Sequence, residues 1–396
     1  MGRKYEKITF ILLTFADMKN KWAIIVIGIL VFGFLLRLVL TVRWANKYMS
    51  FTKQEGSNLS IAQKAYVANE WESTISVVDT ANNTLVKTID VSEQYYGKLL
   101  SFSAHNVQVW PKWTVVVVTA NIAEDKEEWH SDQEVNKDEL IIIDPITDTI
   151  VWRIGLDKWA HLAHVVVTSD DTIAYATSQD KWKVYVIDLL TKEVKDTIIL
   201  REWSQPHWMR LSLDGKYLYV ALIGEKWIAR VDTSDFWVKI IPLNWKVVQV
   251  AVTPDNKYVF ASLYNTKSIA RYDISTEEIK IINLPDWALW PVQLYPTPDS
   301  AFIYVADQWY YFDEPISNSI YKIDVNTLSV VEKYTWWKAP HGVVVAPNGE
   351  KTYVTNLLSN DVTVINNKQN RVESTIAVGK MPNGISIWTR WIGWTP

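Results

Sequence analysis

The strongest constraint on the fold is a hairpin-like unit that recurs seven times along this chain of 396 residues. Each copy begins with an alternating apolar stretch that ends in Asp or Asn, passes through a short turn and continues as a second stretch. The residues at the turn are Asp79, Asp144, Asp188, Asp232, Asp273, Asp324 and Asn366. A carboxylate or amide at such a position accepts hydrogen bonds from the backbone of the turn. The pattern therefore predicts seven β-hairpins.

Further strands precede each hairpin. One is an alternating stretch such as YVAN (66–69), YVAL (219–222) or YVTN (353–356). In six copies this stretch follows another strand and a turn of the Pro-Asp-Gly kind, as in VVVAPNGEKTYV (343–354). Four short strands recurring every 40–50 residues or so are typical of a β-propeller blade.

The two ends of the repeated region complement each other. The first copy begins at its second strand, whereas the last segment, 381–388, is an inner strand without a second one. Their pairing predicts an all-β, seven-bladed β-propeller over 65–388, with blade 1 closed by strand 383–387 and a tail at 389–396. A closed ring leaves no free sheet edge.

The repeats resemble a known family. YVTNLLSNDVTVIN, YVANEWESTISVVDT and PHGVVVAPNGEKTYVTN are similar to the YVTN-type β-propeller repeat of surface-layer and other extracytoplasmic proteins. The resemblance covers 65–388, and it implies the propeller fold and a place outside the cytoplasm. It does not select a function, because this architecture hosts binding proteins, lactonases and haem or copper enzymes alike.

The N-terminal region predicts a membrane anchor. Residues 22–42 form an apolar run, interrupted only by Arg37, that is long enough to span a bilayer as a helix. A basic segment (1–21) precedes the run, and a polar stretch (43–64) that reads as a tether follows it without a small-residue cleavage site. We expect a single-pass plasma-membrane protein with its propeller on the extracytoplasmic side.

Tryptophan is abundant and glycine is scarce, with 22 Trp against 13 Gly. Together they make up about 9% of the chain, near the roughly 7% that glycine alone usually reaches. Trp208 takes the place of Gly342 in the repeat, Trp113 that of Gly349, and Trp182 and Trp227 fall in turns where glycine would tolerate positive φ. One interpretation is a propeller with aromatic loops. The other is that UGA codons of the gene, which some bacterial lineages read as glycine, appear here as Trp.

Histidines supply the candidate ligand-binding residues. By the geometry of a blade, all six should lie on one face near the mouth of the central channel: His105, His130, His161, His164, His207 and His341. His105, His207 and His341 share one repeat position, at the start of the innermost strand. Either Pro-His-Gly is a turn motif of the repeat, or the imidazoles converge on an anionic ligand or a transition metal such as copper, zinc, iron or nickel.

The same face should carry two long insertions. The first, 122–139, has eight acidic residues, and its alternating oxygen donors could bind Ca²⁺ as a speculative metal site. These donors are Asp132, Glu134, Asn136 and Asp138. The alternative is a solvated acidic loop, because the glycine and the terminal glutamate of an EF-hand are missing. The second insertion, 307–319, is aromatic and acidic, and insertions on one face of a repeat protein usually mark its binding side.

Two functions remain open. A net charge of −4 and the lack of a dense basic block beyond the N-terminus argue against nucleic-acid binding, and the absence of Cys excludes thiolate chemistry. The favoured function is a non-enzymatic binding or scaffold module at the cell surface, whose partner is a surface protein, a glycan or a small ligand. The alternative is a redox enzyme or cofactor carrier that uses the histidines with a metal or, less favoured, a d1-type haem.

Overall fold

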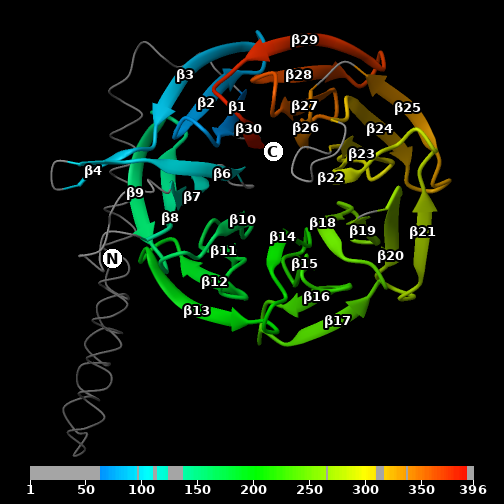
Figure 1. The fold of residues 1–396 in the computed structure, drawn as a ribbon, viewed down its shortest axis with the longest axis horizontal. Helices are drawn as coiled ribbons and strands as arrows, with labels where there is room; N and C mark the ends of the chain where they lie inside the picture. Colours follow the sequence, from blue (N-terminus) through cyan, green and yellow to red (C-terminus); the bar gives the residue numbers. More distant parts are fainter. Residues whose placement is uncertain are drawn as a thin grey trace, which may run out of the picture. The chain divides into compact units, whose positions relative to one another are not determined.

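The computed structural model describes residues 63–95, 98–109, 114–123, 137–264, 266–308, 316–335 and 338–389. Contacts group Ile61–Pro396 into one compact unit. Seven four-stranded antiparallel sheets surround a central axis in this unit (Figure 1). The predicted seven-bladed propeller is therefore confirmed.

The blades follow one another along the chain. Blades 2 to 7 each begin with their inner strand, whereas the inner strand of blade 1 is β30 (Pro382–Thr389), the last strand described. Blade 1 contains β30, β1 (Gln63–Asn69), β2 (Thr74–Asp79) and β3 (Thr84–Asp90). Blade 2 contains β6 (Phe102–Val109), β7 (Val116–Ile122), β8 (Glu139–Asp144) and β9 (Thr149–Gly155). Blade 3 contains β10 (Leu162–Val167), β11 (Ile173–Ser178), β12 (Lys183–Asp188) and β13 (Glu193–Ile199). Blade 4 contains β14 (Pro206–Leu211), β15 (Tyr217–Leu222), β16 (Trp227–Asp232) and β17 (Val238–Pro242).

The remaining blades have the same order. Blade 5 contains β18 (Val247–Val252), β19 (Tyr258–Leu263), β20 (Ser268–Asp273) and β21 (Ile279–Asn283). Blade 6 contains β22 (Pro291–Pro296), β23 (Phe302–Asp307), β24 (Ser319–Asp324) and β25 (Val330–Thr335). Blade 7 contains β26 (Pro340–Val345), β27 (Lys351–Asn356), β28 (Asp361–Asn366) and β29 (Arg371–Ala377). A two-stranded hairpin, β4 (Glu93–Tyr95) and β5 (Lys98–Leu100), lies between blades 1 and 2 in the chain.

Side-chain alternation and turn chemistry explain the blades. The inner three strands bury both faces, so each hydrophobic cluster joins residues of adjacent blades. For example, Val67 and Ile385 of blade 1 cluster with Val364 of blade 7. The turn residues act as predicted: the carboxylate of Asp79 accepts the backbone N–H of Ala81 at 2.9 Å, and the amide oxygen of Asn366 accepts that of Gln369 at 3.0 Å.

The first and last described strands pair in blade 1. β30 pairs antiparallel with β1, with Ile387 opposite Ala65 and Ile385 opposite Val67. Figure 1 shows this last strand, at the red end of the colour scale, beside the blue strands of the same blade. No sheet edge of the ring is therefore left open at the junction.

The membrane anchor predicted at 22–42 and the tether at 43–64 fall outside the described residues, apart from the last two positions of the tether. Within the part of the chain that the structure describes, no helix has the length and apolar character needed to cross a bilayer.

Candidate functional site at the channel mouth

The site is formed where the inner strands enter their sheets. In several blades the pairing with the second strand is interrupted there, as between Pro340 and Val343. A hydroxyl group on the second strand holds the bulge, since Thr355 Oγ1 accepts the backbone N–H of Gly342 at 2.7 Å. Thr177 Oγ1 does the same for His164 at 2.9 Å. A bulge re-aims neighbouring side chains, which gives this position of the repeat its shared orientation.

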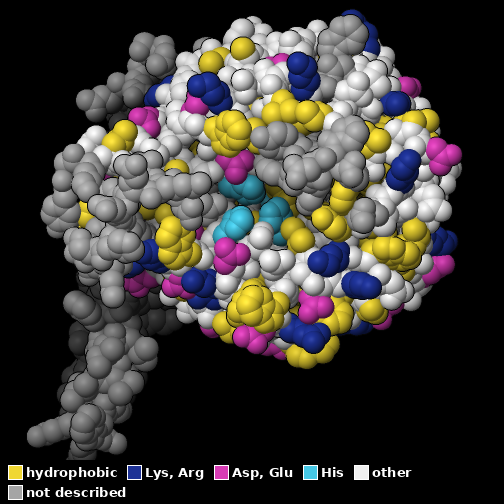
Figure 2. Space-filling view, viewed as in Figure 1, with side chains coloured by type: hydrophobic (Ala, Val, Ile, Leu, Met, Phe, Trp, Pro, Cys, Tyr) yellow, Lys and Arg dark blue, Asp and Glu magenta, His cyan; other side chains and the backbone are white. Residues whose placement is uncertain are grey.

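Three blades place histidine at the entering position. These are His105 on β6, His207 on β14 and His341 on β26. The rings of His105 and His207 meet edge to face with centroids 5.9 Å apart, although they belong to blades 2 and 4. Histidine side chains gather near the centre of the ring, with acidic groups beside them (Figure 2). The structure therefore brings the three equivalent histidines to one mouth of the channel.

Glu70 belongs to this site, and the sequence analysis missed it. Its Oε1 lies 3.0 Å from Nδ1 of His105, and its Oε2 accepts a hydrogen bond from Asn383 Nδ2 at 2.9 Å. Burial alone would raise the pKa of Glu70, but the charge and hydrogen bond of His105 and the amide of Asn383 outweigh it and lower the pKa to about 2. Glu70 is therefore ionised at neutral pH. Its position in the turn after β1, on the same face as the inner-strand starts, was the available sequence signal.

Three buried imidazoles at the mouth and directly below it are neutral at pH 7. Burial, followed by the positive charge of Arg210, holds the pKa of His164 well below its usual range. Burial and the neighbouring His105 do the same for His207 and lower the pKa of His341 to about 3. Nε2 of His105 and Nδ1 of His207 are buried and have no hydrogen-bond partner among the described residues. Buried polar atoms of this kind usually have a partner.

A second layer of side chains closes the channel below the mouth. Trp208, only 3% exposed, lies with its ring 4.3 Å from that of His164 and 6.5 Å from that of His341. Between the neighbouring blades 5 and 6, Gln249 Nε2 donates to Gln293 Oε1 at 2.6 Å. All of these side chains are buried. We call Asn106, His164, Trp208, Gln249 and Gln293 the plug layer.

The remaining predicted histidines do not join the cluster. His161 is partly exposed, and its Nδ1 lies 3.5 Å from the carboxylate of Asp180. His164 lies in the plug layer, one residue further along its strand than the other three histidines. His130 lies outside the described residues.

Only one of the four predicted calcium ligands is described. Asp138 accepts the backbone N–H groups of Ile122 and His161, one on each carboxylate oxygen, both at 2.9 Å. It thereby ties both ends of the first insertion to the start of β10. Asp132, Glu134 and Asn136 fall outside the described residues.

The tryptophans fall into two structural groups. Trp182 has a φ of 53° and Trp203 a φ of 66°, the left-handed region that favours glycine. Trp227 is different, because it begins strand β16 and its φ is not positive, so the turn predicted for it is wrong. The Gly342 position is also not a turn: a Cβ there would lie 2.3 Å from the carbonyl oxygen of Asn383. Close backbone approach therefore explains Gly342.

Among the residues described by the structure, no three His, Asp or Glu side chains are placed to hold a metal ion together. The arrangement instead offers hydrogen-bonding groups: neutral imidazoles, an ionised carboxylate and an amide. The fold and this mouth define the chain as a seven-bladed β-propeller with a polar, histidine-bearing channel entrance.

Within that class, a family model described as a YNCE-like beta-propeller matches residues 245–391. No curated protein matches the chain in sequence. Among solved structures, the chain is similar to a functionally unknown protein from Desulfotomaculum acetoxidans, with a TM-score of 0.64 and 14% identity over 82% of this chain and 99% of that one.

Two further solved structures have the same fold. A putative 6-phosphogluconolactonase from Bacteroides uniformis gives a TM-score of 0.62 and 13% identity, covering 82% of this chain and 99% of that one. Hydrazine synthase of Kuenenia stuttgartiensis gives a TM-score of 0.59 and 16% identity, covering 73% of this chain and 96% of that one. These likenesses support the fold alone, and the varied names agree with an architecture that does not determine function.

Proposed function

We propose that this protein is a membrane-anchored, extracytoplasmic binding module whose ligand sits at the channel mouth formed by His105, His207 and His341. The observation that carries the proposal is a pair of buried ring nitrogens on two different blades, Nε2 of His105 and Nδ1 of His207, for which the described residues offer no hydrogen-bond partner. A ligand that bonds to both would remove the free-energy penalty of leaving them unsatisfied.

The groups at the mouth favour a polar ligand rich in hydroxyl groups, such as a glycan. Neutral imidazoles both donate and accept hydrogen bonds, and the ionised Glu70 accepts them. A carboxylate at the mouth disfavours an anion by charge repulsion. A neutral polyol satisfies all of these groups without bringing a charge into a partly buried site.

The test uses defined saccharides. Isothermal titration with chitotriose, maltotriose and a peptidoglycan disaccharide should show binding of at least one of them to the purified propeller. The double variant His105→Ala/His207→Ala should lose that binding, whereas His161→Ala, a histidine outside the cluster, should retain it. Failure of all three sugars to bind the wild-type protein, or equal binding by the double variant, would refute the glycan site.

A second candidate function is a transition-metal or haem protein. The neutral state of His164, His207 and His341 favours it, because imidazole binds metals in its neutral form. Metal analysis and an absorption spectrum of protein from the native host test this candidate. A stoichiometric metal or a haem band that disappears in the double variant would support it, and a colourless, metal-free protein would exclude it.

The anchor is tested by fractionation. Protein that begins at residue 1 should remain with membranes and become sensitive to protease added outside intact spheroplasts. Removal of 22–42 should release the propeller from the membrane fraction. A full-length chain found free of the membrane, or protected from external protease, would overturn the proposed placement.

The resemblance of the chain to YVTN-type repeats supports the placement outside the cytoplasm.

We also propose that UGA-encoded glycines appear as Trp in this sequence. The positive φ of Trp182 and Trp203 supports glycine at those positions in the native protein. Intact mass of protein from the native host decides the question. A mass that matches all 22 Trp would rule out the recoding.

A further inference from the structure

A cavity lies on the side of the plug layer away from the histidines, where the inner strands end. Its volume is about 350 Å³, within the range of small-molecule sites. Valines of the inner strands, such as Val166 and Val344, and prolines of the turns that follow them, such as Pro254 and Pro298, form most of its wall. Leu213, on the wall, is 53% exposed, so the cavity opens at this mouth. It is an apolar pocket distinct from the histidine site.

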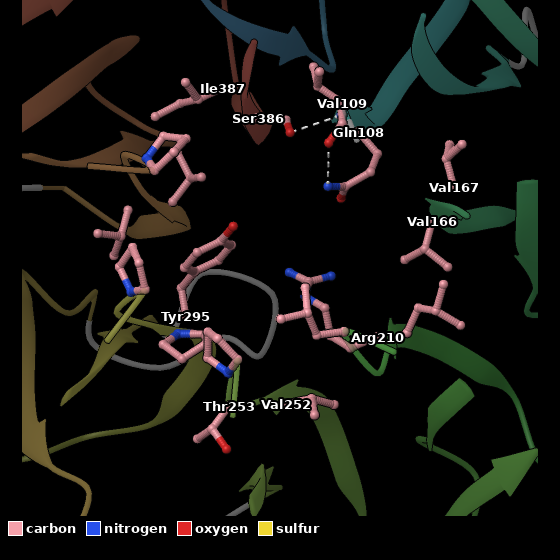
Figure 3. A pocket seen from close by; sticks show the side chains of 18 residues that line it. Gln108, Val109, Val166, Val167, Arg210, Val252, Thr253, Tyr295, Ser386 and Ile387 are labelled. Carbon is pink, nitrogen blue, oxygen red and sulfur yellow. Dashed lines mark hydrogen bonds between the residues drawn. The ribbon is translucent and has the colours of Figure 1, made fainter. Parts of the chain in front are cut away.

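The polar groups of this pocket come from one register position. It lies three residues beyond the entering histidine position on each inner strand. In the seven blades this position holds Gln108, Val166, Arg210, Ala251, Tyr295, Val344 and Ser386. All of them except Ala251 line the cavity. In Figure 3, Arg210 and Tyr295 point from different strands into the same space. In the sequence, the site is marked by Arg210, the one charged residue among the seven at this position.

Arg210 is a cation without an acidic partner among the described residues. Its guanidinium donates to His164 Nε2 at 2.5 Å and to the carbonyl of Met209 at 3.1 Å, both neutral groups. Burial lowers the pKa of Arg210 to about 10, so it stays charged at neutral pH. Lys64, by comparison, pairs with Asp148 at 2.7 Å. Buried Arg271 and Lys322 resemble Arg210 in donating to neutral acceptors, the carbonyl of Val325 and the amide oxygen of Asn370, but neither of them lines the cavity.

The two neutral acceptors fix the orientation of Arg210. Because His164 and Met209 hold one side of the guanidinium, its remaining N–H groups face the cavity, beside the ring of Tyr295 (Figure 3). A buried cation that is not paired is unfavourable. A bound anion would satisfy it, and a planar carboxylate matches the fork of the guanidinium.

We propose that this pocket binds a small amphipathic carboxylate, with the carboxylate on Arg210 and a compact apolar body against the valine and proline wall. The single cation favours one negative charge over the two of a phosphate monoester. The apolar wall favours an aliphatic or aromatic body over a sugar acid. This proposal does not depend on the histidine mouth, and none of the residues lining the pocket is a tryptophan.

The test compares octanoate with octanamide, its neutral isostere, by isothermal titration. Wild-type protein should bind octanoate at least tenfold more tightly than octanamide. Arg210→Gln should remove that preference, and Arg230→Gln, which changes an arginine outside the pocket, should keep it. Equal affinity of the two ligands for wild-type protein, or an unchanged preference in Arg210→Gln, would overturn the proposal.

Two further measurements keep the test decisive. If Arg210→Gln fails to fold, Val344→Phe, which fills part of the cavity, should weaken octanoate binding at least tenfold and leave the ligands of the histidine mouth unaffected. Phenylacetate in place of octanoate distinguishes an aromatic body from an aliphatic one. Failure of both carboxylates to bind wild-type protein at millimolar concentration would also overturn the proposal.

Discussion

The buried histidines should make this propeller sensitive to mild acid. His164, His207 and His341 are held neutral in the folded protein, with pKa values below the usual one near 6.5. In the unfolded chain they titrate normally. Below about pH 6.5 the unfolded state therefore binds more protons than the folded state, and the free energy of unfolding falls as the pH falls.

The size of the effect follows from the number of protons. Each histidine that stays neutral in the fold lowers the free energy of unfolding by about 1.4 kcal/mol for every pH unit below about 6.5. Three such residues give up to about 4 kcal/mol between pH 7 and pH 5.5. That is a large part of the roughly 5–15 kcal/mol that stabilises an ordinary domain. The loss ends for each residue once the pH passes below its folded pKa, which for His341 is about 3.

Urea unfolding at pH 7.5, 6.5, 6.0 and 5.5, followed by circular dichroism, measures the slope. His207→Gln should reduce the slope by about one third, because one of the three protons no longer contributes. Lys368→Gln, an exposed change, should leave it unaltered. A free energy of unfolding that stays constant from pH 7.5 to 5.5 would refute the assignment of neutral, buried imidazoles.

Three further changes probe the ring and its turns. Deletion of 380–396 removes the closing strand with buried Ile385 and Ile387, each worth about 1.5–3 kcal/mol, so cooperative thermal unfolding should be lost. Deletion of 391–396 alone should preserve it. Asp138→Ala leaves two backbone N–H groups without their acceptor and should lower the free energy of unfolding by about 2–4 kcal/mol, with faster hydrogen exchange at Ile122 and His161. Asp132→Ala should change neither. Trp203→Gly, at an exposed residue with positive φ, should be neutral or stabilising by up to about 1 kcal/mol. Trp237→Gly, at an exposed residue without positive φ, should destabilise by about 0.5–1 kcal/mol. The opposite order for the two tryptophans in chemical denaturation would count against strain at Trp203.

The repeats contain most of the fold because each blade uses the same local chemistry. Alternating apolar residues set the strands, and Asp79 and its equivalents set the turns. The common position of His105, His207 and His341 could likewise be read from the repeat, since equivalent residues in equivalent blades face the same axis. Such an inference needs only the symmetry of the ring.

The features that break the symmetry could not be inferred in this way. Glu70 acts through a contact between blades 1 and 2, and Arg210 depends on which six residues share its layer. Whether a side chain finds a partner across the channel depends on all seven blades together. The need for glycine at 342 likewise comes from another blade, because a Cβ there would lie 2.3 Å from the carbonyl oxygen of Asn383 in blade 1.

The plug layer decides whether the two mouths act separately. Trp208 lies between the histidine mouth and the second pocket, with its ring 6.0 Å from that of His207 and 5.6 Å from the guanidinium of Arg210. With Trp at this position, a ligand at the histidines and a carboxylate at Arg210 occupy separate compartments.

Glycine at 208, as in the recoding hypothesis, would remove most of that barrier and leave His164 and Arg210 facing one continuous channel. The two binding events should then become coupled, because both ligands would contact groups joined by the hydrogen bond between His164 and Arg210. Titrating octanoate into Trp208→Gly with and without a bound saccharide distinguishes the cases: a changed octanoate affinity indicates one channel, and an unchanged affinity indicates that the blades close over the gap.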